Sequence, residues 1–147
     1  MRVAIGSDER NATTDAVVES LGERGIEVDL YGPLAGQGEE WAEVSVKVAR
    51  EVADGRADQG IVFCWTGTGC SIAANKIPGI RAALCPDAET ARGARRWNDA
   101  NVLAMSLRLA TPILAREIVE AWLDTNDVDP SEKANIDRVR ELDRDEC

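Results

Sequence analysis

The order of apolar and polar residues predicts a chain in which short strands alternate with amphipathic helices. Five apolar runs have the length of buried strands, at 2–7, 26–31, 59–64, 80–85 and 101–106. Stretches with helical spacing follow them, at 13–25, 41–55, 69–76, 87–97, 112–123 and 131–145. In the second of these, apolar residues at 41, 44, 48 and 52 form one face, and Gly55 ends the helix.

Residues with strong local preferences mark the ends of several predicted elements. Asp87 and Ser131 stand where helix N-caps are expected, and Pro112 lies in the first turn of its helix. Because strands and helices alternate with short connections, we expect an α/β fold, a parallel sheet with helices on both faces in the doubly wound class. The length predicts one domain, 1–147.

The net charge of −10 argues against nucleic acid or an anionic membrane as a partner, since phosphate groups need compensating Lys and Arg. No stretch reaches the roughly 18 apolar residues of a membrane span. The first residues, M-R-V-A-I-G-S-D, lack the apolar region of a secretory signal. We therefore expect a soluble cytoplasmic protein.

Four cysteines and the absence of histidine limit the possible chemistry. Cys64, Cys70, Cys85 and Cys147 show no C-x-x-C spacing, so neither a structural zinc site nor any other metal or cofactor is expected. In a cytoplasmic protein these thiols are expected to be reduced. Without histidine, acid–base chemistry must use Cys, Asp, Glu, Lys, Tyr or a hydroxyl.

The stretch F-C-W-T-G-T-G-C follows the third predicted strand, at the end of the sheet where such folds form their sites. Gly67 and Gly69 allow backbone N–H groups to converge, which suits a phosphate, a carboxylate or an enediolate; an ordinary tight turn explains the glycines equally well. Cys64 fits two interpretations, a thiolate favoured by the following helix N-terminus or a small buried apolar residue.

The chain resembles the ribose-5-phosphate isomerase B and galactose-6-phosphate isomerase family over about residues 1–125. The resemblance is carried by three segments: A-I-G-S-D, G-I-V-F-C-W-T-G-T-G-C-S-I-A-A-N-K-I-P-G-I-R-A-A-L-C and W-N-D-A-N-V-L-A-M-S-L-R. It implies a Rossmann-like three-layer αβα sandwich with a five-stranded parallel sheet. It also implies aldose–ketose isomerisation of a sugar phosphate through an enediol, without a cofactor. A homodimer or tetramer is implied, with active sites between subunits and the C-terminal helix, about 131–145, packed on a partner.

The resemblance also assigns roles to residues of the loop. Cys64 matches the catalytic thiolate of one branch of the family, and Thr66 matches a hydroxyl that assists proton movement. Gly67, Thr68 and Gly69 match the backbone cradle of the enediolate. Another branch uses a glutamate as the base, at the position of Cys70, which makes Cys70 the second choice.

At the substrate end the sequence departs from the family pattern. The family carries Asp-His where this chain has Asp8-Glu9, a tyrosine where it has Trp41, and a histidine, assigned to opening the sugar ring, where it has Trp97. The resemblance also implies Asn98 and Arg108 as substrate-binding positions. In the C-terminal stretch, where many members carry G-G-R-H to hold the phosphate, only Arg138 aligns, with Lys133 and Arg140 as substitutes.

Two explanations fit an altered substrate shell beside a retained proton-transfer loop. In the first, the enzyme isomerises a sugar phosphate, either like ribose 5-phosphate or shorter, for which no histidine has to open a ring. In the second, the chain is a non-catalytic or repurposed protein that binds a sugar phosphate in a changed pocket. Trp41 and Trp97 would stack on a sugar in either case, or simply pack at a dimer interface.

Overall fold

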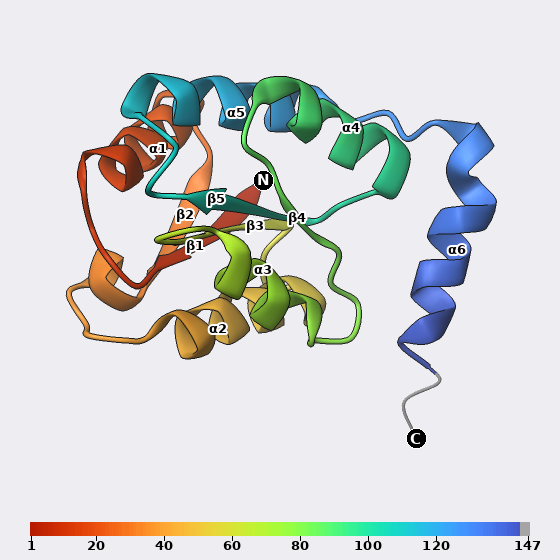
Figure 1. Cartoon of the computed structure of the whole chain (residues 1–147), viewed down its shortest axis with the longest axis horizontal. Coiled ribbons are helices and arrows are strands. Elements are labelled where there is room, and N and C mark those ends of the chain that lie inside the picture. The colour runs from red at the N-terminus through yellow and green to blue at the C-terminus, as the bar shows by residue number, and fades with distance from the viewer. Residues whose placement is uncertain (145–147) are drawn as a thin grey trace.

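A computed structural model describes residues 1–144, and a parallel β-sheet lies at its centre (Figure 1). The strands are β1 (Arg2–Ser7), β2 (Glu27–Tyr31), β3 (Gln59–Cys64), β4 (Ala82–Leu84) and β5 (Val102–Ser106). They stand in the order β2-β1-β3-β5-β4, and every neighbouring pair is parallel. The expected five-stranded α/β fold is confirmed.

Helices cover both faces of the sheet. The α-helices are α1 (Ala12–Glu23), α2 (Trp41–Ala53), α3 (Thr68–Asn75), α4 (Ala88–Asn98), α5 (Pro112–Asp124) and α6 (Lys133–Leu142). Two 3-10 helices, η1 (Gly32–Ala35) and η2 (Pro130–Glu132), lie in the connections. Helices α1, α4 and α5 pack together on one face, and α2 and α3 pack on the other (Figure 1). This is the three-layer sandwich that the resemblance implied.

The strands bury side chains on both faces, because successive residues of a strand point to opposite sides. In β3, Ile61 and Phe63 belong to the core under α1, α4 and α5, whereas Val62 and Cys64 belong to the core under α2 and α3. Cys64 is the last residue of its strand. Its side chain therefore lies on the side of the sheet where the chain continues into α3.

Several predicted boundaries differ from the structure by one or two residues, and in two places side-chain contacts explain the difference. The fourth strand is shorter than 80–85, because the N–H of Arg81 donates to the side chain of Asn101 (2.8 Å) and not to a neighbouring strand. Ser131 does not cap the last helix. The Asp129 side chain instead accepts a hydrogen bond from the N–H of Ser131 (2.9 Å) and starts η2, after which α6 begins at Lys133. The predicted end of that helix at 145 lies outside the described residues. Asp87, in contrast, caps α4 as expected.

Helix α6 stands away from the sandwich, on the side of the sheet where β4 begins (Figure 1). Polar contacts hold it there: Arg140 pairs with Asp99 (2.5 Å), and Asp143 accepts from the N–H of Gly79 (2.9 Å). The side chains of Val139 and Leu142 are about half exposed. Helix α6 thus presents apolar surface that the body of the chain does not cover.

Candidate active site

The candidate site lies where three neighbouring strands end. In the sheet, β3 lies between β1 and β5, and Cys64 of β3 is level with Ser106 of β5. A pocket of about 330 Å³ opens at this edge. Its walls come from the residues after β1, the start of α2 and the β3–α3 loop, and they are Asp8, Trp41, Cys64, Trp65, Thr66, Thr68 and Gly69.

The β3–α3 loop needs glycine at position 67. Gly67 has φ +78°, a left-handed conformation that side chains disfavour, and it forms the N-cap of α3. A Cβ atom there would stand 2.5 Å from Cδ1 of Leu84 and 3.0 Å from main-chain atoms of Met105 and Ser106. The loop is therefore folded tightly against β5, with the start of α3 aimed at the end of β3.

The loop is also fastened to the connection after β5. The Ser106 hydroxyl donates to the carbonyl of Trp65 (3.0 Å), and the N–H of Arg108 donates to the same carbonyl (2.9 Å). The N–H of Leu107 donates to the carbonyl of Cys64 (3.0 Å). These bonds fix the main chain around Cys64 and hold the Arg108 backbone beside the pocket.

Cys64 ionises more readily than an ordinary thiol. A hydrogen bond from the Cys70 side chain is the largest cause that lowers the pKa of Cys64, to about 6. The N–H groups of Cys70, Gly67 and Thr66 add to the effect, and burial of the sulfur opposes it. Most Cys64 side chains are accordingly thiolates at neutral pH.

Cys70 is held in the opposite state. Its side chain is fully buried, and its Sγ lies 3.3 Å from the carbonyl oxygen of Gly67. The hydrogen bond to Cys64 is the largest cause that raises the pKa of Cys70, and burial and the charge of Cys64 raise it further. Cys70 therefore keeps its proton, and of the two thiols only Cys64 lines the pocket.

Hydroxyl, carboxyl and aromatic groups surround the thiolate. The hydroxyls of Thr66 and Thr68 hydrogen-bond each other (2.7 Å). Burial is the main cause that raises the pKa of Asp8 above its usual range. The Trp41 ring packs against Gly69, where a Cβ would stand 2.9 Å from a ring carbon. The pocket thus combines one nucleophilic or basic sulfur with hydrogen-bonding groups and an aromatic wall.

Comparison with known proteins shows to which family the chain belongs. The sequence model of the Ribose/Galactose Isomerase family matches residues 3–142. The chain belongs to the ribose/galactose isomerase family. It is 35% identical to Ribose-5-P isomerase B of Listeria innocua, over 98% of each chain, and 38% identical to D-erythrulose-4-phosphate isomerase of Pectobacterium atrosepticum, over 84% of this chain and 83% of that one. The structure of ribose-5-phosphate isomerase B from Clostridium thermocellum superposes with a TM-score of 0.89 at 37% identity, covering 98% of each chain. The expected family and the expected class of enzyme, a sugar-phosphate isomerase, are confirmed.

Within this family member, the site residues predicted from the sequence fall into two groups. The first group lies at the carboxyl ends of the strands. It contains the pocket residues Asp8, Trp41, Cys64, Thr66, Thr68 and Gly69, with Gly67 and Cys70 directly behind them and Arg108 after β5. Glu9 follows Asp8, but its side chain is exposed and does not line the pocket.

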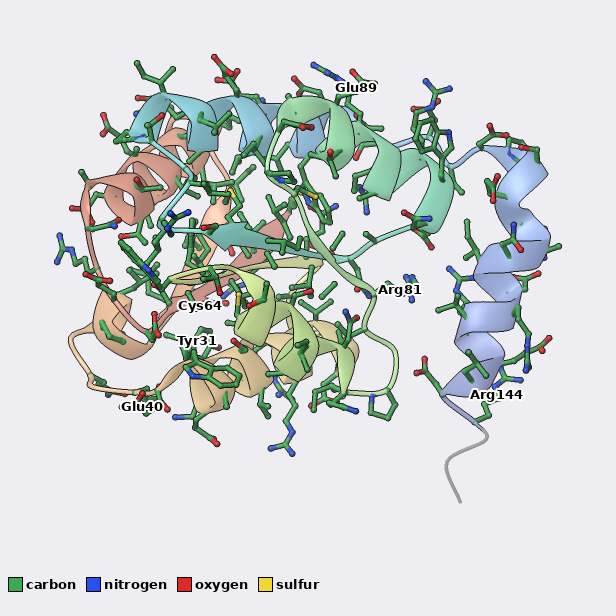
Figure 2. The ribbon with its side chains drawn as sticks, viewed as in Figure 1. Tyr31, Glu40, Cys64, Arg81, Glu89 and Arg144 are labelled. Atoms are coloured by element: carbon green, nitrogen blue, oxygen red, sulfur yellow. The ribbon has the colours of Figure 1, made fainter. Side chains whose placement is uncertain are left out.

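The second group lies at the other end of the sheet. Trp97 and Asn98 end α4, which returns the chain to the start of β5, and they line a groove of about 300 Å³ beside α6. Lys133 and Arg138 lie on α6, where Lys133 pairs with Asp137 and Arg138 with Glu141. In Figure 2, Cys64 is at the left end of the sheet, whereas Arg81, which shares the groove with Trp97, is on the right. One chain does not bring the two groups together.

Trp65 is a pocket residue that the sequence reasoning did not single out. Its side chain lines the pocket next to Cys64 and is 58% exposed. Its position directly after the strand-ending cysteine was a usable signal, because the first residue beyond such a strand borders the site.

Two properties of the described residues concern metal binding and membrane insertion. Among residues 1–144, no three or more Cys, Asp or Glu side chains are grouped as ligands for a metal ion. No helix in that part of the chain combines the length and apolar character that crossing a membrane requires.

Proposed function

We propose that the chain interconverts an aldose phosphate and the corresponding ketose phosphate, with Cys64 as the base. The observation that carries the proposal is the lowered pKa of Cys64, about 6, in a pocket that opens at the ends of the strands. A base is most effective when its pKa lies near the working pH, because it is then both deprotonated and able to hold the proton. Cys70, with its raised pKa, does not meet this condition.

In the proposed reaction, the Cys64 thiolate removes a proton from the carbon next to the carbonyl of an open-chain sugar. The electron pair moves towards the carbonyl oxygen and forms an enediolate. The thiol then returns the proton to the neighbouring carbon, which exchanges aldehyde and ketone. The N–H groups of Thr66, Gly67 and Cys70 are directed at the sulfur, so the N–H groups of Thr68 and Gly69, in the first turn of α3, are left to hold the enediolate.

Side chains of the pocket supply the remaining roles. Thr66, hydrogen-bonded to Thr68, is placed to pass a proton between the two substrate oxygens. Asp8 lies in the pocket and would bind a sugar hydroxyl. Arg108 is exposed beside the pocket, and no carboxylate among residues 1–144 lies within ion-pair distance of it. Its guanidinium is therefore available for the substrate phosphate.

A short substrate fits this pocket best. Trp41 and Trp65 form bulky walls, and no histidine is present to open a sugar ring. The hydroxyl that would close a five-membered ring in a tetrose 4-phosphate carries the phosphate, so the sugar stays open. The relative from Pectobacterium atrosepticum is named for a phosphate of the tetrulose erythrulose. We therefore assign a tetrose 4-phosphate as the preferred substrate, ahead of a pentose 5-phosphate.

Isomerase assays on a series of aldose phosphates test this function. We expect turnover of erythrose 4-phosphate with a kcat/KM at least about tenfold above that of ribose 5-phosphate, since the longer sugar must also open its ring and pass the two indoles. Allose 6-phosphate, the largest, is expected to react slowest. In D₂O the product should carry deuterium at the carbon that Cys64 reprotonates. If the protein binds these sugars but turns over none of them, it is a sugar-phosphate-binding protein and not an isomerase.

We also propose that a second copy of the chain completes the site. Trp97 is 51% exposed at the far end of the sheet, and α6 carries the exposed apolar side chains Val139 and Leu142 beside its basic residues. A two-fold dimer that packs α6 on a neighbour would cover these side chains. It would bring Trp97, Lys133 and Arg138 of one protomer to the Cys64 pocket of the other.

Mixing two inactive variants tests the shared site. Cys64→Ala lacks the base, and a Lys133→Ala/Arg138→Ala double variant lacks the basic residues of α6. After the two are unfolded together and refolded, half of the dimers should be mixed, and each mixed dimer has one complete site. The mixture should therefore recover about a quarter of wild-type activity. If mass analysis shows that mixed dimers have formed but no activity is recovered, each site uses a single chain.

A further inference from the structure

Cys64 and Cys70 form a pair of thiols. A site that used one reactive sulfur would not need the second thiol. Both side chains are buried in the core under α2 and α3, at 5% and 0% exposure. Both belong to the same apolar cluster, Cys70 Sγ is 3.3 Å from the carbonyl of Gly67 in the turn between them, and the Cys70 side chain acts on the Cys64 sulfur as a hydrogen-bond donor. The left-handed turn at Gly67 brings them together despite the five residues that lie between them in sequence.

The two thiols differ in how they can be reached. Cys64 lines the pocket, whereas Cys70 lies behind it at the start of α3 and does not. A small molecule that enters the pocket therefore meets Cys64 first. Cys85 is also buried, but in the core on the opposite face of the sheet, so it is separated from both by the sheet itself.

We propose that this pair is a reversible oxidation site, in which a hydroperoxide oxidises Cys64 and Cys70 then closes a Cys64–Cys70 disulfide. In the first step the Cys64 thiolate attacks one oxygen of hydrogen peroxide. An S–O bond forms, the O–O bond breaks, and the other oxygen leaves as hydroxide, so sulfur is oxidised and the peroxide is reduced. Oxidation removes the charge on Cys64 that kept Cys70 protonated, and in the second step the Cys70 sulfur attacks the Cys64 sulfur. The S–S bond forms, the S–O bond breaks, and the hydroxyl leaves as water with the Cys70 proton.

The second step protects Cys64 from further oxidation. A thiolate that reacts with peroxide and has no partner proceeds to the sulfinic acid, which ordinary dithiols do not reduce. A thiol already in contact with the oxidised sulfur closes the disulfide first, and a dithiol can reopen it. The disulfide would block the thiolate and protect it from irreversible oxidation. The chemistry needs only the two thiols, so it goes beyond the proposed isomerase and holds whether or not Cys64 serves as the base.

Peptide mass measures the outcome directly. Trypsin releases residues 57–76 as one peptide that contains Cys64 and Cys70 and no other cysteine. The full chain is treated with hydrogen peroxide, alkylated and digested. We expect the wild-type peptide to lose about 2 Da, the mass of two hydrogens, and to regain them with dithiothreitol. A wild-type peptide that instead gains about 32 Da, as a sulfinic acid, without a form lighter by 2 Da would overturn the proposal.

Matched variants test whether the reversible oxidation requires this pair of thiols. In Cys70→Ser the resolving sulfur is absent, and we expect Cys64 to gain oxygen in a form that dithiothreitol does not remove. In Cys85→Ser, another buried thiol is removed, and the peptide should lose 2 Da as in the wild type. Equal recovery of Cys64 in wild type and Cys70→Ser would show that Cys70 does not resolve the oxidised sulfur. If a variant fails to fold, the mass of the wild-type peptide still tests the proposal. This measurement does not depend on isomerase activity.

Discussion

Replacement of Cys64 by alanine is expected to lower kcat by a factor of about 10²–10⁴, the range that a positioned base contributes. The expected loss is in kcat more than in KM, because the sulfur moves a proton in the reaction while other pocket residues bind the sugar. Steady-state rates on erythrose 4-phosphate measure the effect. Cys85→Ala is the matched control, since Cys85 is a buried cysteine in the opposite core, with its pKa raised by burial to about 12. It should keep activity within about threefold of wild type. If the Cys64→Ala enzyme kept more than a tenth of the wild-type kcat, Cys64 would not be the base.

The same variant identifies the thiolate. Thiolate absorbance near 240 nm should rise in the wild type as pH increases through about 6, and this step should be missing in Cys64→Ala. An ordinary cysteine would give the step near pH 8.5. If the thiolate is the base, as proposed, the reaction rate should increase with pH through the same midpoint. The protein is titrated without substrate, since a phosphate monoester also titrates near pH 6. A midpoint above about 8 would contradict the hydrogen bonds assigned to the sulfur.

Gly67→Ala is expected to lower the free energy of unfolding by about 2–5 kcal/mol. A left-handed φ costs an alanine about 1–2 kcal/mol, and overpacking adds about 1–3 kcal/mol. The new Cβ would stand 2.5 Å from Leu84 Cδ1, which can move, and 3.0 Å from main-chain atoms of Met105 and Ser106, which belong to the interior strand β5 and cannot. Urea unfolding measures the loss, and the displaced loop should also lower kcat.

Gly36→Ala is the matched control for this variant. Gly36 has the same φ, +78°, but nothing lies within 4 Å of the position that a Cβ would take there, so only the conformational cost of about 1–2 kcal/mol applies. The difference between the two variants isolates the cost of the contact with β5. Equal losses of stability in both variants would mean that the loop moves freely away from the sheet.

Hydrophobic periodicity was sufficient to predict the secondary structure because the core imposes it. Of the predicted face of the second helix, Val44 and Val48 are fully buried in α2 and Val52 is partly buried, whereas Trp41 at its start is 42% exposed. The apolar run 59–64 is β3, buried along its whole length because helices cover both of its faces. The errors occurred where a distant side chain overrides a local preference. Asn101 takes the N–H of Arg81 and shortens β4, and Asp129 rather than Ser131 begins the last helical segment.

The site was only partly predictable, for a reason that Cys64 and Cys70 illustrate. The sequence and its family resemblance identified the loop and named both cysteines. Which of them ionises depends on where a few N–H groups and one thiol point, and this follows from the turn at Gly67, not from the spacing of six residues. Trp65 was overlooked because a lone aromatic residue in a loop has no periodic pattern, and its role depends on the pocket that it borders.

The pattern of residues along the chain therefore specified the α/β fold, the family and the loop that is proposed to carry the chemistry, since each of these depends on local order and composition. The folded arrangement specified the rest. It makes Cys64 the acidic thiol and Cys70 its donor, because dipoles act over a few ångströms of space and not along the sequence. It also places Trp97, Asn98, Lys133 and Arg138 at the far end of the sheet, because α4 runs back to the start of β5 before α6 begins.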